Sequence, residues 1–385
     1  MFILNRSHAD DIDQVLFELH RNPAATTELE RLGNLFAQRA FLRKLAAILR
    51  AASQAHRTPG TRVTVQLDWI DKRPYLASIS TPKVWHNKVE VGDAAVFFID
   101  EIRARPSSPV PRTAVAASGL ILQAKRTTAF SAQLPTVHVH NNASSRKEYA
   151  LLSAWPPADL YLSTHQSSLL LSGLDFQTGY PALDQANTRA RGWYVVTPNS
   201  QPAQIVGTAG SYGFVPPYDR DWRSPWMGAP SVFGRRCGLT LGRMLVGFFT
   251  RAAAHARPQP GAMLFPRIGQ AFDLVRGWTP AQATGSGWDD LCNALLSLKN
   301  KRIGGHGGPG ARSHRSQRIL AFCYEPSRHE GFVGGIAKAA DMDEESGGEH
   351  AYPILTVRRT GFSDWTPNAR DRDRFADARH ADGDG

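Results

Sequence analysis

Two apolar stretches with polar residues near their ends decide the expected fold: VEVGDAAVFF, residues Val89–Phe98, and GLILQAKR, residues Gly119–Arg126. Both are typical of buried β-strands, and we extend them to Val89–Ile99 and Ala114–Ala124. In the second stretch, Gln123 and Lys125 lie two residues apart, so their side chains project from the same face of a strand. Asp93 precedes Gln123 by 30 residues, a separation that one hairpin with a long loop can close. The pattern therefore predicts neighbouring antiparallel strands that bring these three polar side chains together.

A carboxylate, an amide oxygen and an ammonium group on adjacent strands suit the hydrolysis of a phosphodiester. The Asp93 carboxylate supplies the hard oxygen that Mg²⁺ or Mn²⁺ prefers. Such a metal activates water and stabilises developing negative charge, and Lys125 positions the nucleophile or neutralises the transition state. The competing interpretation is structural, because an Asp after Gly is common in turns and a Gln-x-Lys at a strand end is commonly solvated.

The order Asp93, then Gln123-Ala124-Lys125, resembles the PD-(D/E)xK nuclease superfamily, and within it the Mrr-like branch with its Gln-x-Lys half-motif. The resemblance covers residues 27–126. It implies the restriction-endonuclease-like α/β fold, a mixed sheet flanked by helices, in which an upstream helix leads into a hairpin that bears the site. It also implies a set of catalytic residues: Asp93, Gln123, Lys125 and Glu90.

The metal site that the resemblance implies departs from the usual pattern at one ligand. Gln123 stands where an acid is common, so one negative ligand is lost. The loss either makes another acid necessary or marks a catalytically weak relative. The implied metal ligands are Asp93, the carbonyl of Ala124, Glu90, and Glu30 with Glu28 as its alternative.

The remaining periodicity predicts an α/β protein with an additional α+β region. Helices are expected over residues 10–19, Thr27–Ala55, Lys147–Trp155, Leu239–His255 and Trp288–Lys299. Further strands are expected over Val63–Ile70, Tyr75–Ser80, Leu160–Ser163, Trp193–Thr197 and Arg318–Tyr324. We expect a nuclease-like domain over residues 1–165, a basic α+β accessory region over 166–340 and a partly disordered tail over 341–385.

Charge and cysteine usage narrow the class of partner. The 385 residues carry 45 Lys and Arg against 34 Asp and Glu, a formal net charge of +11, which favours a polyanionic partner. No apolar stretch is long enough to span a membrane. Three widely spaced cysteines, Cys237, Cys292 and Cys323, are typical of a reducing compartment. We therefore expect a cytoplasmic protein that binds nucleic acid, double-stranded DNA first of all, and leave its homo-oligomeric state open.

Basic residues concentrate outside the two strands. Residues 291–324 contain no acid, so this stretch could hold phosphates, although a solvated loop is the competing interpretation. Residues 223–276 hold eight Arg and one Asp, and aromatic residues among them can stack on bases or, at helical spacing, belong to the core. The expected nucleic-acid contacts are Arg126, Lys299, Lys301, Arg302, Arg312, Arg315 and Arg318.

Other motifs are weaker. The glycines of residues 305–310 match a dinucleotide fingerprint, but they follow an expected helix and precede a strand, the reverse of the required order. His138 and His140 lack a third metal ligand at a suitable spacing. The leading hypothesis is a Mg²⁺-dependent DNA endonuclease, for which the resemblance alone implies a role in bacterial antiviral defence. The alternatives are a non-catalytic nucleic-acid-binding protein on the same fold and a protein-interaction module.

Overall fold

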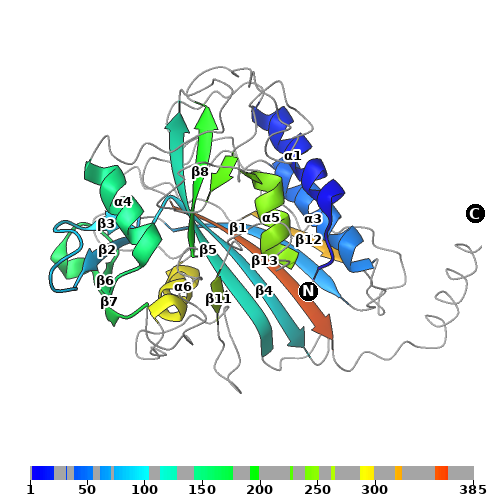
Figure 1. Ribbon diagram of the computed structural model, residues 1–385. Helices are drawn as coiled ribbons and strands as arrows, with labels where there is room; N and C mark the ends of the chain where they lie inside the picture. The colour runs from blue at the N-terminus through cyan, green and yellow to red at the C-terminus, as the bar shows by residue number, and fades with distance from the viewer. Residues whose placement is uncertain are drawn as a thin grey trace, which may run out of the picture.

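The fold is a large mixed β-sheet with helices on both faces and a second, small sheet at one side (Figure 1). It is seen in a computed structural model. The structure describes residues 2–20, 32, 39–54, 61–70, 73–103, 113–127, 143–176, 191–198, 226–228, 239–250, 262–264, 287–298, 317–322 and 352–362. Every structural feature given below belongs to these residues.

The helices form where apolar residues recur at three- and four-residue spacing. In α3, Leu42, Leu45 and Leu49 are all fully buried, which gives the helix one apolar stripe. No helix within the described ranges is both long and apolar enough to cross a membrane. The helices are α1 (Arg6–His20), α3 (Arg39–Gln54), α4 (Ala143–Ala154), α5 (Leu241–Thr250), α6 (Gly287–Leu298) and the short 3₁₀ helix η2 (Gln166–Ser168).

The large sheet has the strand order β10-β9-β8-β5-β4-β13-β1-β12, with β11 also paired to β5. As predicted, β4 and β5 are antiparallel neighbours, with Ala94 opposite Leu122. Two pairs are parallel, β13 with β4 and β5 with β8. The strands are β1 (Arg62–Ile70), β4 (Ala94–Arg103), β5 (Thr113–Thr127), β8 (Gly192–Pro198), β9 (Trp226–Gly228), β10 (Leu239–Thr240), β11 (Ala262–Leu264), β12 (Gln317–Phe322) and β13 (Tyr352–Phe362).

The small sheet has the order β3-β2-β6-β7 and all its pairs are antiparallel. Its strands are β2 (Tyr75–Ser78), β3 (Val89–Glu90), β6 (Ala158–Tyr161) and β7 (Leu169–Leu174). The prediction of one strand over Val89–Ile99 is therefore wrong: the stretch divides between the two sheets. The division occurs at Gly92, whose φ of +120° turns the chain from β3 into β4.

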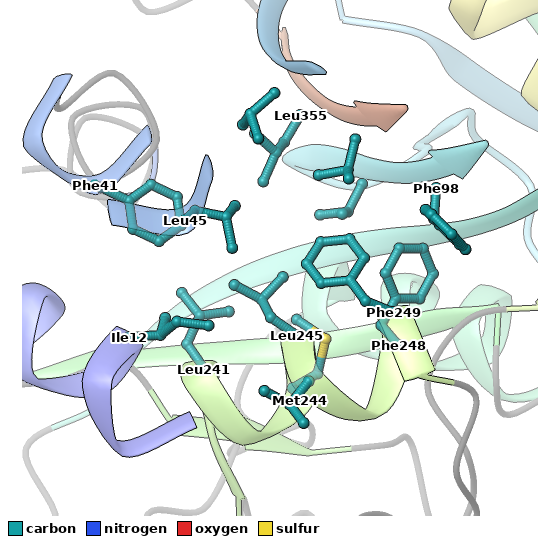
Figure 2. Packing of buried hydrophobic residues seen from close by; sticks show 14 of the residues in the cluster. Ile12, Phe41, Leu45, Phe98, Leu241, Met244, Leu245, Phe248, Phe249 and Leu355 are labelled. Atoms are coloured by element: carbon teal, nitrogen blue, oxygen red, sulfur yellow. The ribbon is translucent and has the colours of Figure 1, made fainter. Parts of the chain in front are cut away.

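Two apolar cores lie on the two faces of the large sheet, because its central strands are buried on both sides. In β4, Val96 and Phe98 face a core with α1, α3 and α5, whereas Ala95 and Phe97 face a core with α4, α6 and the small sheet. Figure 2 shows the first core, where Phe98, Phe248 and Phe249 pack together with side chains from α1, α3 and β13. The alternation places Gln123 and Lys125 of β5 on the second face, beside α4.

The C-terminal stretch, predicted to be a partly disordered tail, contains one strand of the large sheet. Within residues 341–385, Tyr352–Phe362 forms β13, a central strand between β1 and β4. Its side chains from Tyr352 to Val357 are buried. Because β13 lies inside the sheet, the expected domain limit at residue 341 does not separate this segment from the core.

A buried acid ties α1 to the start of α5. The Asp13 carboxylate accepts hydrogen bonds from the Gly242 N–H, at 2.8 Å, and from the Thr240 hydroxyl. Thr240 also accepts a hydrogen bond from the N–H of Arg243, at 3.4 Å. These groups satisfy N–H groups that a helix leaves without intrahelical partners. Burial raises the pKa of Asp13 to about 7, while the two hydrogen bonds oppose that rise.

Asp13→Asn is expected to weaken the pH dependence of stability. The folded protein holds the Asp13 proton more tightly than the unfolded chain does. The protonated carboxyl group therefore contributes its full stabilisation below the pKa that Asp13 has in the unfolded chain, and this stabilisation is lost as pH rises through about 7. Between about pH 5 and pH 8 the loss is about 3 kcal/mol. Urea unfolding at several pH values measures it. An unchanged slope in Asp13→Asn would contradict the raised pKa.

Candidate functional site

The site begins at the turn that carries the chain from the small sheet into β4. Gly92 has a φ of +120°, and a Cβ atom there would lie 2.5 Å from Ile121 Cγ2 and 2.9 Å from the Leu122 carbonyl oxygen. The next residue, Asp93, donates its backbone N–H to that same carbonyl at 2.7 Å. Glycine is therefore required on both conformational and steric grounds, and the turn places Asp93 against β5.

Gly92→Ala is expected to destabilise the protein by about 2–4 kcal/mol, since it combines backbone strain with overpacking. Gly173→Ala is the matched control: Gly173 also has a positive φ, of +70°, but no atom lies within 4 Å of the position that a Cβ would take there. Chemical unfolding of the two variants measures the difference. Equal effects would show that the close approach to β5 contributes nothing.

Asp93 and the Gln-x-Lys segment meet as predicted. Asp93 Oδ2 accepts hydrogen bonds from Gln123 Nε2, at 2.5 Å, and from the Ala124 N–H, at 2.7 Å. Both residues lie on β5, so one strand orients the carboxylate through a side chain and through its backbone. Hydrogen bonds to a carboxylate are among the stronger ones in proteins. Asp93 therefore has a defined orientation and is not a solvated turn residue.

The electrostatic environment of Asp93 disfavours its charged form. Burial is the main cause that raises its pKa to about 7; the positive charge of Lys125 and the Ala124 hydrogen bond oppose the rise, whereas Glu90 and Glu148 add to it. Asp93 and Gln123 are only 5% and 4% exposed. A buried carboxyl group that titrates near neutral pH, beside a cation and two other acids, is typical of functional sites.

Lys125 is paired with an acid that the sequence analysis missed. Its Nζ lies 2.6 Å from Glu148 Oε2, and the two side chains are 16% and 11% exposed. Glu148 belongs to α4, the helix that follows β5 among the described elements. A signal was available: Glu148 is the only acid of α4 and stands three and four residues before the buried Leu151 and Leu152. That spacing directs it toward the sheet and not toward solvent.

Glu90 lies near the site but on the small sheet. It is a residue of β3 and lies opposite Tyr75 of β2. Its Oε1 contacts Arg73 Nη1 at 2.9 Å and accepts a hydrogen bond from the Tyr75 hydroxyl at 3.4 Å. Its charge raises the pKa of Asp93, yet no described hydrogen bond joins the two residues. Glu90 is thus a charged neighbour of Asp93, with its own cationic partner.

Several predicted residues lie outside the part of the chain that the structure describes. Arg126 and Arg318 belong to β5 and β12 by backbone, opposite Thr197 and Gln66, but their side chains are not described. The remaining ones lie wholly outside the described residues: Glu28, Glu30, His138, His140, Cys237, Lys299, Lys301, Arg302, residues 305–310, Arg312, Arg315 and Cys323. The expected basic surface thus stays a prediction.

A metal would find only part of its ligand set here. Among the residues that the structure describes, no three His, Cys, Asp or Glu side chains form a group able to hold a metal ion. The available oxygen donors are the Asp93 carboxylate, the Gln123 amide and the Ala124 carbonyl, and hard cations accept such mixed sets completed by water or phosphate oxygens. Glu90 and Glu148 both raise the pKa of Asp93, and Lys125 opposes them. A bound cation would favour the ionised Asp93 carboxylate, which burial and these two acids disfavour.

Comparison with known proteins adds no family to this description. No family model, no curated protein and no solved structure matches the chain.

Proposed function

We propose that the protein is a metal-dependent DNA endonuclease that hydrolyses phosphodiesters at Asp93. The observation that supports this most directly is the orientation of a buried carboxylate by Gln123 and by the backbone of Ala124, on the strand that also bears Lys125. A solvated turn acid would have neither these partners nor a pKa near 7.

The order of elements supports a restriction-endonuclease-like plan. Helix α3 precedes the strands, Asp93 stands immediately before β4, and Gln123 and Lys125 lie on the antiparallel neighbour β5. This is the arrangement that the resemblance to PD-(D/E)xK nucleases implies. On either side of this antiparallel pair, β13 is parallel to β4 and β8 is parallel to β5, so the site lies on a mixed sheet.

The chain's own groups divide the work of such a reaction. Asp93 and the Ala124 carbonyl would hold Mg²⁺ or Mn²⁺, with Glu90 as a nearby negative charge. When bound, the metal supplies an acidic water and neutralises developing charge. Gln123 and the Ala124 N–H orient the Asp93 carboxylate, and the Lys125 ammonium orients the scissile phosphate. Since the carboxyl group must lose its proton to bind a cation, metal affinity should rise with pH up to about 7.

The alternative is a nucleic-acid-binding protein that has lost the chemistry. The neutral Gln123 and the absence of a three-ligand group among the described side chains favour it. A plasmid assay separates the two: purified protein with Mg²⁺ or Mn²⁺, beside Asp93→Ala and Lys125→Ala. Nicking by the wild type alone supports the endonuclease. Nicking that persists in both variants contradicts the site, and salt-dependent binding without nicking favours the binding protein.

A further inference from the structure

The site is closed to a substrate as the structure stands. Asp93 and Gln123 are almost fully buried, and Lys125 Nζ forms an ion pair with Glu148 Oε2 at 2.6 Å. In the proposed reaction a phosphodiester at Asp93 contacts the same ammonium, because Lys125 lies on the same face of β5 as Gln123 and its charge acts on Asp93. Glu148 and a substrate phosphate therefore compete for one cation.

Glu148 is held firmly in this position. Its second oxygen, Oε1, accepts a hydrogen bond from the Ser144 hydroxyl at 3.0 Å, one helical turn earlier. Leu151 and Leu152 anchor the same helix in the core below the sheet. A carboxylate presents oxygens to an ammonium group in the way that a phosphate does. The helix thus offers Lys125 a fixed anion of its own.

The charge balance makes this contact unfavourable for an incoming phosphate. Glu90 and Glu148 both lie close enough to raise the pKa of Asp93, so a phosphate that approaches Lys125 meets other acids nearby. Neutralising Glu148 would remove the acid that lies closest to the Lys125 ammonium among its described contacts. The same substitution would also replace the carboxylate that Lys125 Nζ contacts at 2.6 Å by a neutral amide, a weaker competitor for a phosphate oxygen.

We propose that Glu148 occupies the place of the scissile phosphate on Lys125 and keeps the site inactive until the DNA backbone displaces it. The inference rests on the proposed function, since it assigns Lys125 to phosphate binding. It makes Glu148 an inhibitory residue, not a ligand that the reaction needs. The substrate exchanges one anion for another at Lys125, so the site opens without leaving a buried cation unpaired.

The experiment compares Glu148→Gln with the wild type in two assays. Binding of a short fluorescein-labelled DNA duplex is measured by anisotropy in EDTA, and plasmid nicking is measured in Mg²⁺. Gln keeps the shape of the side chain and a hydrogen-bond acceptor for Lys125. We expect about tenfold tighter binding, which corresponds to about 1.4 kcal/mol, and a similar gain in the nicking rate at low DNA concentration. Thermal unfolding checks that both proteins fold.

Asp100→Asn is the control matched in charge. Asp100 lies on β4 and pairs with Arg359 at 3.1 Å, so this variant also removes one negative charge and one ion pair, away from Lys125. Equal tightening in both variants would overturn the proposal, because net charge alone would explain it. Loss of nicking in Glu148→Gln with unchanged duplex binding would overturn it as well, while the endonuclease proposal would stand. Tighter binding in Glu148→Gln without nicking by any form supports the competition and contradicts the endonuclease.

Discussion

Asp93→Asn is expected to abolish Mg²⁺-dependent nicking and to leave the fold intact. The amide keeps an oxygen that can accept the hydrogen bonds of Gln123 and of the Ala124 N–H, so the geometry of the turn is retained. What disappears is the negative charge that would bind the cation in the proposed site. A lost charged ligand removes several kcal/mol of transition-state stabilisation, so the rate should fall at least about a thousandfold.

The same substitution should not lower stability at alkaline pH. Burial raises the pKa of Asp93 to about 7, so the ionised carboxylate is unfavourable in the metal-free protein above that pH. Removing it should make the metal-free variant at least as stable as the wild type at about pH 8. Urea unfolding in EDTA measures this. The measurement separates a loss of chemistry from a loss of structure.

Asp13→Asn is the matched control for both readouts. Asp13 is also buried, its pKa is also raised to about 7, and its carboxylate also accepts a backbone N–H. It belongs to α1 and contacts the start of α5, on the opposite face of the sheet from Gln123 and Lys125. The two substitutions should change stability alike, but only Asp93→Asn should lose nicking. Nicking by Asp93→Asn within about tenfold of the wild type would remove Asp93 from the proposed site.

Lys125→Ala should lower both activity and stability, for separate reasons. Nicking should fall at least about a hundredfold because the phosphate loses its positively charged partner. Stability should fall by about 3 kcal/mol because Glu148 stays largely buried without the ammonium that it contacts at 2.6 Å. Plasmid nicking and chemical unfolding measure the two losses independently.

The double variant Lys125→Met with Glu148→Leu distinguishes these losses. Replacing both charged partners by apolar side chains of similar size removes the unpaired charge, and stability should return to within about 1 kcal/mol of the wild type. Nicking should stay absent, since no cation faces the phosphate. Recovery of nicking in the double variant would show that Lys125 acts only by pairing with Glu148. A double variant as unstable as Lys125→Ala would show that the ion pair is not the source of the lost stability.

Local pattern was sufficient for the elements that bear the site. Helix α3, strands β1 and β5 and helices α4, α5 and α6 all lie within predicted segments or overlap them closely, whereas β4 shares only residues 94–99 with its predicted segment. The meeting of Asp93 with Gln123 was predictable as well, because two consecutive strands joined by one loop are commonly neighbours in a sheet. The restriction-endonuclease-like identity of the fold remains a proposal.

Local pattern was not sufficient where the partner is distant in sequence or belongs to another element. Glu148 follows Lys125 by more than twenty residues and meets it only because α4 packs against β3 and against β8, the neighbour of β5. Glu90, three residues before Asp93, is separated from it by the turn at Gly92, whose positive φ does not appear in a hydropathy pattern. Residues 89–99 therefore read as one continuous apolar stretch in the sequence, although they are divided between β3 and β4.

The sequence alone therefore determined which residues alternate along β4 and β5, and so which polar side chains share a face with Asp93. This follows from the two-residue period of a strand, which is a local property of the backbone. Only the tertiary structure decided that β13 lies between β1 and β4 and that the Glu148 carboxylate pairs with the Lys125 ammonium. Both depend on which distant apolar surfaces pack together, and the hydrophobic effect that drives this packing is not directional, so no local spacing encodes the partner.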